Sequence, residues 1–172
     1  MGSSEVEIEV LPMTLGDLDA IFSIDRKIRA MGKAITYASL TTERIFGIDR
    51  KVSRLGRPTS YIDLITRDVS GLLALGLVAK IEGHVRGFIL GRLAYVGETA
   101  TEVGVITILG VHPDYQRKGI ASQLVKAICG KYSSKGIKTV RIGIDQRDKE
   151  LLSFFENTGF SVGHLINYSK TL

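Results

Sequence analysis

A run of three β-rich segments in the middle of the chain constrains its fold more than any other feature. The segments cover residues 76–82, 84–96 and 102–111. The dipeptide Glu82-Gly83, between the first two, is typical of a tight hairpin turn. The middle of the chain is therefore predicted to form an antiparallel meander. Alternation along the third segment predicts one face made of Val103, Val105, Thr107 and Leu109.

Helical patterns precede this meander. A strand over 5–11 ends at Pro12, and Thr14 with two following aspartates then opens a helix to about residue 30. A second helix is predicted over 37–49, before a polar and basic loop over 50–70. The N-terminal half is thus expected to supply one strand and two helices.

A second set of elements follows the meander. The predicted elements are a helix over 119–134, a strand over 138–144, a helix over 148–158 and a strand over 160–168. The apolar stripe of the first helix consists of Ala121, Leu124, Val125, Ile128 and Tyr132. Asp148 is expected to cap the second helix and Gly159 to stop it. This order of elements indicates a single α/β or α+β domain.

The segment VHPDYQRKGIA places two cations, Arg117 and Lys118, just before Gly119, where a helix begins. That end of a helix already carries positive charge and unpaired backbone N–H groups. Gly119 also lets a backbone approach a ligand closely. The combination indicates a site for a phosphate or a pyrophosphate. The spacing matches neither a Walker loop nor the dinucleotide motif G-x-G-x-x-G.

The same segment resembles motif A of the GNAT superfamily of N-acetyltransferases, whose signature is Q/R-x-x-G-x-G/A after a strand that ends in V-x-P. Here Gln116-Arg117-Lys118-Gly119-Ile120-Ala121 follows Val111-His112-Pro113. The later run DKELLSFFENTGF, residues 148–160, resembles the family's second cofactor-side element, N-x-x-A-x-x-L-Y-x-x-x-G-F. The resemblance covers about residues 76–168.

The resemblance implies an α/β (α+β) fold, with a mixed, splayed β-sheet flanked by helices on both faces. It implies a single N-acetyltransferase domain over 1–172, in which 1–4 are flexible and about 76–168 form the cofactor-binding core. Acetyl-CoA, as the acyl donor, is expected between strands 102–111 and 138–144. The acetyl group would pass directly to a primary amine, and no metal is expected.

Site residues follow from the resemblance position by position. The cofactor-binding residues that it implies are Leu109, Val111, Gln116, Arg117, Lys118, Gly119, Ile120, Ala121, Ser122, Asp148 and Phe155. Glu102 is the carboxylate that the family analogy favours as catalytic base, with Glu98 as the next candidate. Phe155 replaces the tyrosine that commonly protonates the leaving thiolate. The proton is therefore expected from water, Tyr132 or Tyr168.

Two further residues carry chemistry but are interpreted as structural. His112 occupies the variable position of V-x-P and is taken as a loop histidine without a chemical role. Cys129 is the one cysteine, so no intramolecular disulfide can form, and it is taken as a buried structural thiol. A reducing cytoplasm is the expected compartment. No secretory signal is visible, and the apolar stretch 71–79 is too short to span a membrane.

The charge balance leaves several partners open. The net charge is +5, which suits nucleic acid, acidic lipid or a polyanionic cofactor. The cations are spread along the chain without an aromatic–basic motif, so no nucleic acid is expected. The basic stretches 26–33 and 51–57 disfavour a strongly basic acceptor.

The resemblance favours an acetyl-CoA-dependent N-acetyltransferase. Its acceptor would be a protein N-terminus or lysine, or else a small amine. Many members of the family dimerise, so the resemblance also allows a homodimer. The alternative is a CoA-binding regulatory module of the same fold with little activity, which the phenylalanine at position 155 supports.

Overall fold

A computed structural model of the chain describes residues 6–31, 74–96, 99–164, 168 and 170–172. Its elements, in chain order, are β1 (Glu9–Pro12), the 3-10 helix η1 (Leu15–Asp17), α1 (Leu18–Ala30), β2 (Leu77–Ile81), β3 (His84–Val96), β4 (Thr101–Val111), the 3-10 helix η2 (Pro113–Tyr115), α6 (Ile120–Ser134), β5 (Val140–Arg141) and α7 (Lys149–Asn157). The helix predicted over 37–49, the loop over 50–70 and Glu98 lie outside the described residues.

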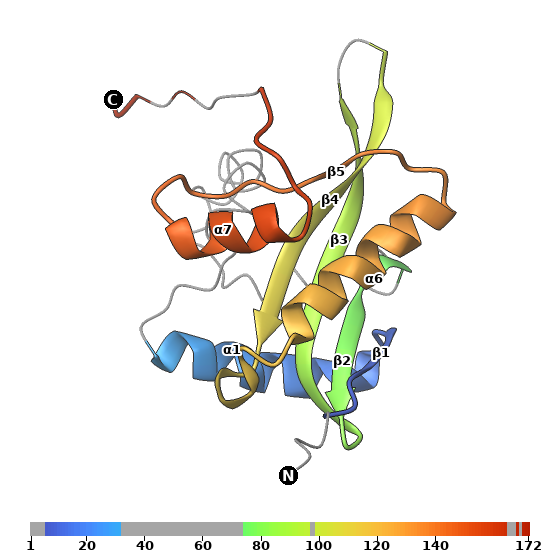
Figure 1. Ribbon diagram of the computed structural model, residues 1–172, viewed down its shortest axis with the longest axis vertical. Coiled ribbons are helices and arrows are strands. Elements are labelled where there is room, and N and C mark those ends of the chain that lie inside the picture. The colour runs from blue at the N-terminus through green and yellow to red at the C-terminus, as the bar shows by residue number, and fades with distance from the viewer. Residues whose placement is uncertain (1–5, 32–73, 97–98, 165–167, 169) are drawn as a thin grey trace.

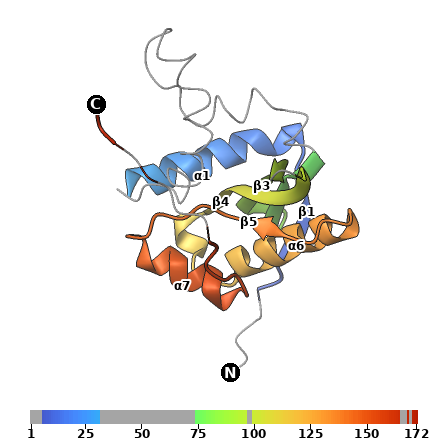
Figure 2. The ribbon, with the colours of Figure 1, turned by 90° about the horizontal axis from the view of Figure 1, so that it is seen from above.

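The five strands form one mixed sheet in the order β1-β2-β3-β4-β5 (Figure 1). Neighbouring strands are antiparallel from β1 to β4, and β5 runs parallel to β4. Helix α1 covers one face of the sheet, and α6 and α7 cover the other (Figure 2). The predicted mixed sheet with helices on both faces is therefore confirmed. No helix within the described ranges has the length and apolar character to cross a membrane.

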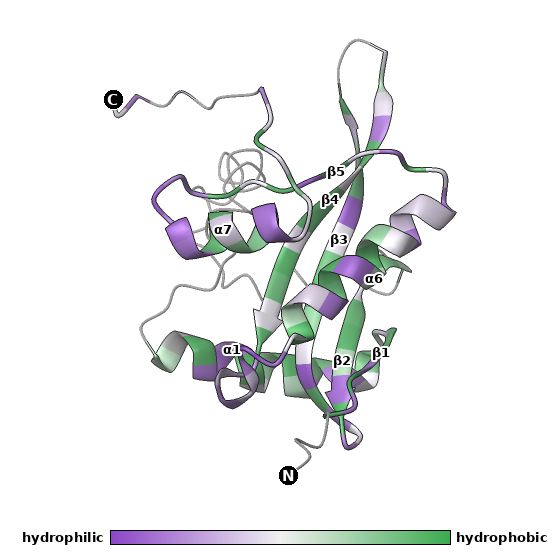
Figure 3. Cartoon of the chain, viewed as in Figure 1, coloured by the Kyte–Doolittle hydropathy of each residue, from purple (hydrophilic) through white to green (hydrophobic). Residues whose placement is uncertain are grey.

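Hydropathy follows this layering. Figure 3 shows hydrophobic residues along β2 and the lower part of β4, whereas α1 and α6 carry both hydrophobic and hydrophilic residues. Strands covered on both faces bury most of their side chains, and a helix on the outside buries only one stripe. The first core cluster joins α1 to the sheet and includes Ile21, Ile24, Ile28, Phe88 and Leu90. The second lies under α6 and α7.

The first turn of the N-terminal helix is fixed by a reciprocal cap. The backbone N–H and the hydroxyl of Thr14 both donate to Oδ2 of Asp17, at 2.9 and 2.8 Å. Lys80 of β2 lies 3.1 Å from the other oxygen of Asp17. This arrangement confirms the helix start predicted at Thr14, and it ties that start to the sheet.

The predicted hairpin joins β2 to β3. Glu82 and Gly83 both have positive φ, 50° and 75°, as a two-residue type I′ turn requires. Beyond it, β3 and β4 continue as a long antiparallel pair whose far end projects past the other strands (Figure 1).

Thr107 interrupts the regular pairing of β3 with β4. Leu90 pairs with Ile108 and Gly91 pairs with Ile106, so Thr107 is an extra residue, and its hydroxyl donates to the Leu90 carbonyl at 3.2 Å. An extra residue reverses the alternation of side chains along a strand. The face of β4 toward α6 therefore consists of Gly104, Ile106, Leu109 and Val111. The prediction that Val103, Val105, Thr107 and Leu109 share a face is wrong for this reason.

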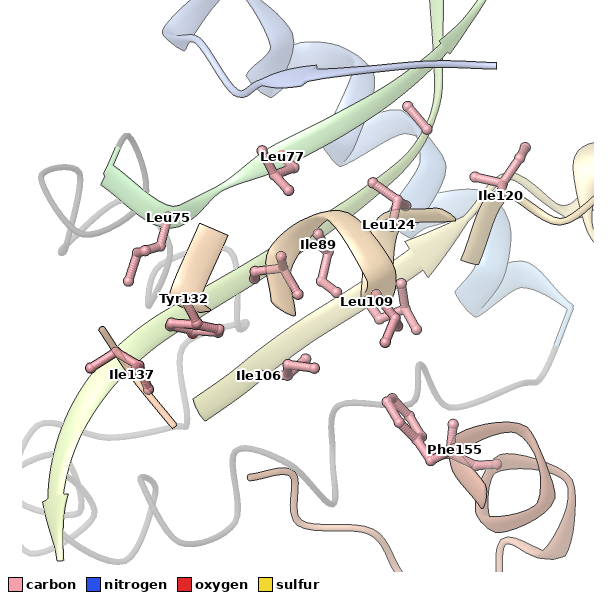
Figure 4. Packing of buried hydrophobic residues seen from close by; sticks show 14 of the residues in the cluster. Leu75, Leu77, Ile89, Ile106, Leu109, Ile120, Leu124, Tyr132, Ile137 and Phe155 are labelled. Atoms are coloured by element: carbon pink, nitrogen blue, oxygen red, sulfur yellow. The ribbon is translucent and has the colours of Figure 1, made fainter. Parts of the chain in front are cut away.

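Helix α6 lies close against the sheet because glycines make room for it. A Cβ atom on Gly91 or Gly104 would overlap the Tyr132 side chain. Without those atoms, the Tyr132 hydroxyl lies 2.9 Å from the Val105 carbonyl and 3.1 Å from the Arg92 carbonyl, and it donates to them. Of the predicted stripe, the buried members are Leu124, Val125, Ile128 and Tyr132, whereas Ala121 is half-buried. Figure 4 shows Leu124 and Tyr132 within the packed cluster.

The C-terminal elements differ from the predictions in two places. The strand predicted over 138–144 is reduced to Val140–Arg141. The strand predicted over 160–168 does not form in its described part, residues 160–164, where no strand of the sheet pairs with it. Phe160 instead packs edge-on against Phe155, with ring centroids 5.2 Å apart. A β-rich pattern forms a strand only where a partner edge is available, and here an aromatic contact holds the segment.

Candidate active site

The two edges of β4 are paired to very different extents. Along one edge, β4 pairs with β3 from Thr101 to Val111. Along the other, β5 pairs only with Gly104 and Val105, and the Gly104 N–H donates to the Thr139 carbonyl at 3.0 Å. Within the described residues, β4 therefore has no strand partner on this side from Ile106 to its end. The separation begins next to the bulge at Thr107, a kind of irregularity that is common beside active sites.

The hydrogen-bonding pattern shows which backbone groups face this open edge. The His112 N–H donates to the Arg86 carbonyl of β3 at 2.8 Å. In an antiparallel pair, the residues that bond to the partner alternate with residues whose N–H and C=O point away. Leu109 and Val111 therefore point their backbone groups toward the open edge. The Gln116 side chain donates to the Val111 carbonyl at 3.4 Å, which agrees with this direction.

The loop after β4 turns sharply twice before α6 begins. Arg117 and Gly119 both adopt left-handed backbone conformations, with φ of 63° and 82°. Such a conformation is uncommon for a residue other than glycine, and strained residues gather at binding sites. The loop ends at the N-terminus of α6, whose first N–H groups have no partners in the helix. The segment therefore has the geometry of an anion site.

The two cations of the loop, Arg117 and Lys118, contact different neighbours. Arg117 Nη2 lies 2.9 Å from Glu150 Oε1, in the first turn of α7, and this ion pair is exposed to solvent. Lys118 Nζ lies 4.8 Å from the centre of the Tyr115 ring. An exposed ion pair contributes about 0–1 kcal/mol, so an incoming phosphate could replace Glu150 as the partner of Arg117.

The first residues of α6 differ in what they can offer a ligand. Ile120 is only 1% exposed, and it packs over Gly87 of the sheet, so it can offer only its backbone N–H. Ala121 is half-buried and Ser122 is exposed. The structure thus brings the loop, the start of α6 and the open edge of β4 together, as predicted. The cofactor-binding roles of these residues stay predictions.

Helix α7 forms the apolar wall that lies across the open edge. Phe155 is buried, and its ring lies 5.0 Å from that of Phe154 in an edge-on contact. It belongs to the same core cluster as Leu109 (Figure 4). Asp148 accepts a hydrogen bond from the Leu151 N–H at 3.0 Å, so the predicted helix cap is confirmed. Its predicted contact with the cofactor stays a prediction.

The tyrosines considered as proton donors differ in their surroundings. Tyr132 is fully buried and its hydroxyl already donates to backbone carbonyls; burial raises the pKa of that hydroxyl far above its usual value. It is therefore a structural residue rather than a source of protons. Tyr168 is exposed. Cys129 is half-buried, less than the buried thiol predicted from the sequence, and burial raises the pKa of its thiol; its structural role stays a prediction.

Glu102 lies at the opposite end of β4 from the loop. It is half-buried, and its partner across the ladder is Tyr95, on the projecting end of the β3–β4 pair. At about 3.3 Å per residue, the strand runs about 30 Å from Glu102 to Val111. The structure therefore does not bring Glu102 close to the predicted anion site. Its role as catalytic base stays a prediction.

His112 has surroundings that the sequence did not indicate. The sequence predicts a loop histidine without a chemical role, whereas the side chain is only 5% exposed and its Nε2 lies 2.8 Å from Nζ of Lys27 in α1. Burial, followed by the charge of Lys27, lowers the pKa of its imidazole. The sequence signal was only its position between Val111 and Pro113. In the described ranges, no cluster of three or more histidine, cysteine, aspartate or glutamate side chains could hold a metal ion.

Comparisons with known proteins agree with this geometry. Residues 43–160 match the sequence profile of the acetyltransferase (GNAT) family. The aminoglycoside acetyltransferase meta-AAC0020, from an uncultured soil metagenomic sample, shares 20% identity with a TM-score of 0.61, over 99% of this chain and 98% of that one. The aminoglycoside N-acetyltransferase AAC(6')-Iy, solved with CoA, shares 13% identity with a TM-score of 0.68, over 99% of each chain.

A third similar structure is the ribosomal-protein-alanine N-acetyltransferase from Brucella melitensis biovar Abortus 2308. It shares 15% identity with a TM-score of 0.61, over 96% of this chain and 99% of that one. At such identities, these likenesses show a common fold.

Proposed function

Because this chain belongs to the acetyltransferase (GNAT) family, we propose that it transfers an acetyl group from acetyl-CoA directly to a primary amine. The observation that carries the proposal is the open edge of β4, which leads straight into the left-handed loop at the start of α6. The proposal treats residues 1–172 as one N-acetyltransferase domain.

The donor substrate would bind along this edge in two parts. The backbone from Gln116 to Ala121, with Arg117 and Lys118 beside it, would hold the pyrophosphate. Leu109 and Val111 would bind the two amides of the pantetheine arm, because they present donors and acceptors at strand spacing. Ser122, Asp148 and Phe155 would complete the contacts. This fit rests on an unpaired strand edge and an anion-binding helix start, both of which the described residues provide.

Direct transfer places three demands on the protein. The amine must lose a proton before it attacks, and Glu102, acting through water, is the proposed base. A backbone N–H on the open edge would stabilise the charge that grows on the thioester oxygen. The leaving thiolate needs a proton, which we assign to water or Tyr168 because Phe155 carries none and Tyr132 is bonded to backbone carbonyls.

The acceptor is proposed to be either a protein N-terminus or lysine, or a small amine. Acetyltransferases of both kinds, for aminoglycosides and for a ribosomal protein, have the same fold. Arg26 and Lys27 on α1 are exposed, and a basic surface disfavours a strongly basic acceptor such as an aminoglycoside. This charge argument favours an acidic or neutral acceptor, and it leaves both a peptide and a small amine open.

A second function is supported by one observation, the phenylalanine at position 155. Its buried ring packs between Phe154 and Phe160, and it leaves the wall of α7 without a proton donor. A protein with this wall could bind CoA and regulate a partner without efficient chemistry. The variant Phe155→Tyr distinguishes the two functions: faster turnover than wild type would show that the missing hydroxyl limits the chemistry.

The test combines binding with turnover. Thermal unfolding of the full chain is followed with and without acetyl-CoA, and thiol release is followed with peptide N-termini, lysine peptides, amino acids, polyamines and aminoglycosides. Stabilisation together with turnover on one class would support the enzyme and name its acceptor. Stabilisation without turnover on any class would favour the regulatory module. Absence of stabilisation by acetyl-CoA and by CoA would reject both functions.

A further inference from the structure

His112 links α1 to the loop that forms the proposed anion site. Its backbone makes the last bond of β4 to β3, and its ring lies between Lys27 of α1 and the turn η2. Nε2 lies 2.8 Å from Lys27 Nζ, and Nδ1 lies 3.2 Å from the Asp114 N–H. Because Lys27 itself lies on the exposed side of α1, its ammonium remains hydrated while it reaches the buried ring.

The protons at this contact allow only a neutral ring. An ammonium and a backbone N–H can only donate, and a neutral imidazole has a single nitrogen that accepts. A protonated imidazole accepts from neither group, and it would carry a positive charge 2.8 Å from the Lys27 ammonium. When Nε2 accepts from Lys27, the single ring proton lies on Nδ1, which faces Asp114 Oδ2 at 3.8 Å and cannot also accept from the Asp114 N–H. Protonation of Nε2 therefore breaks the contact of His112 with α1.

Tyr115 extends this link from His112 to the anion loop. The His112 and Tyr115 rings meet edge-on with centroids 5.4 Å apart. Arg86 of β3 lies 4.4 Å above the Tyr115 ring, and Lys118 lies 4.8 Å from it. A chain of contacts therefore runs from α1 through two rings to a cation of the loop.

We propose that neutral His112 is a positioning residue, which accepts a hydrogen bond from Lys27 and thereby holds the loop in the conformation that binds the phosphates of CoA. The inference rests on the proposed function, and it deepens it. His112 is not expected to touch the substrate, because its ring faces α1 rather than the open edge of β4. The inference adds that a residue outside the CoA-binding surface sets the affinity of the protein for CoA.

The charged groups that face the ring define the expected pH dependence. Among the described residues they are Lys27 of α1, Asp114 of η2 and Arg86 of β3. Burial, then Lys27, lowers the pKa of His112, with a smaller opposing effect from Asp114. A pKa that is lower in the folded protein than in the unfolded one gives stability that is present above the unfolded value, about 6.5. That stability is lost as the pH falls through the folded pKa, and CoA affinity should fall with it.

The first test measures the pKa of each histidine ring by NMR, in the full chain with and without saturating CoA. The chain has three histidines, so the ring signals are few. We expect CoA to bind about fivefold more tightly when His112 is neutral than when it is protonated. Saturating CoA must then weaken proton binding to His112 by the same factor, which lowers its pKa by about 0.7. A polyanion that is merely nearby would raise that pKa. An unchanged or raised value for His112 would overturn the proposal. His84, in the exposed β2–β3 hairpin, is the internal control.

The second test uses variants and the dissociation constant of CoA at pH 7.5. Lys27→Met removes the donor on an exposed surface, and we expect about fivefold weaker binding. Arg26→Met removes the same charge from the next position of α1, and its affinity should equal that of wild type. His112→Asn keeps a polar side chain but is shorter and lacks a nitrogen at the position of Nε2 for Lys27, so it should match Lys27→Met. The double variant should bind no more weakly than either single variant.

The outcomes separate this inference from the function on which it rests. If wild type fails to bind CoA, the proposed function and the positioning role both fall. If wild type binds but Lys27→Met binds as tightly as Arg26→Met, only the positioning role falls. Additive losses in the double variant would equally overturn it, because two residues that act through one contact cannot lose it twice.

Discussion

The two edges of β4 show how one strand can serve both stability and binding. Toward β3, the strand is paired along its whole length, and α6 lies close above it on glycines. Toward β5, among the described residues, only Gly104 and Val105 are paired, and the edge from Ile106 onward has no strand partner. On the closed side, the backbone groups of β4 that face β3 are paired within the sheet. On the open side, the backbone keeps donors and acceptors for a ligand.

The open part of the β4 edge begins close to Thr107. The extra residue reverses which side chains face α6, and the described pairing with β5 ends two residues before it, at Val105. Tyr132 fixes the strand just before this point through the Val105 carbonyl. The comparison predicts that changes on the closed side alter stability without altering affinity for CoA, and that changes on the open side do the opposite.

The largest effect is expected where the closed side is tightest. Gly91→Ala places a methyl group on the Tyr132 hydroxyl, and this overlap should lower the free energy of unfolding by about 3 kcal/mol. Gly130→Ala is the matched control, since a Cβ atom there meets nothing within 4 Å. In the exposed interior of α6 it should raise stability by about 1 kcal/mol. Urea unfolding measures the free energy of unfolding of both variants. Equal changes in the two variants would contradict the claim that α6 packs closely on Gly91.

A smaller loss of stability is expected from Tyr132→Phe. The variant keeps the ring and removes only the hydroxyl that donates to the Val105 and Arg92 carbonyls. Two buried acceptors lose this donor, so the free energy of unfolding should fall by about 2 kcal/mol. The stabilisation of this variant by saturating CoA should equal that of wild type. If CoA no longer stabilised this variant, the claim that the two edges of β4 act independently would be contradicted.

Gly119 has two proposed roles on the open side: it adopts a left-handed backbone conformation, and it leaves room for the pyrophosphate beside the backbone. Its φ is 82°, and a Cβ atom there meets nothing within 4 Å. Gly119→Ala should cost about 1–2 kcal/mol of stability, whereas Gly119→Asn should cost less, since asparagine tolerates the left-handed conformation. Both should weaken CoA binding, as measured by calorimetry, because either side chain keeps the pyrophosphate from the backbone. Full binding by the asparagine variant would show that only the conformation matters.

The smallest effect is expected at the ion pair between Arg117 and Glu150. Glu150→Gln removes the carboxylate that lies 2.9 Å from Arg117, and stability should change by about 0.5 kcal/mol or less because the pair is exposed. CoA should bind about twofold more tightly, since Arg117 no longer has to leave a carboxylate for a phosphate. Titration at low ionic strength measures this change. Weaker binding would show that Glu150 supports the loop instead of competing for its arginine.

Much of the fold could be predicted because its signals are local. The turn at Glu82-Gly83, the cap at Asp148 and the buried stripe of α6 each depend on residues a few positions apart. The loop before Gly119 was recognisable for the same reason. These elements supply most of the proposed binding surface, which is why the sequence alone could suggest its position.

The features that the sequence did not reveal depend on distant contacts. The bulge at Thr107 follows from the register between two strands, which a single strand cannot specify. The contact between Lys27 and His112 joins residues 85 positions apart. The shortened β5 likewise depends on its pairing with β4, which is limited to Gly104 and Val105. Local patterns therefore suffice to propose a ligand site, whereas tertiary contacts determine how its strand edge is opened and how its loop is held.

The most direct test of the two-edge account is amide hydrogen exchange at single residues of β4, measured by NMR in the full chain with and without CoA. The account predicts fast exchange at Leu109 and Val111 in the free protein, and slow exchange at Ile108 and Gly110, which point toward β3. Saturating CoA should slow exchange at Leu109, Val111 and the loop from Gln116 to Ile120, and leave Ile108 and Gly110 unchanged. Equal protection of all four strand amides in the free protein, or no response to CoA at Leu109 and Val111, would contradict it.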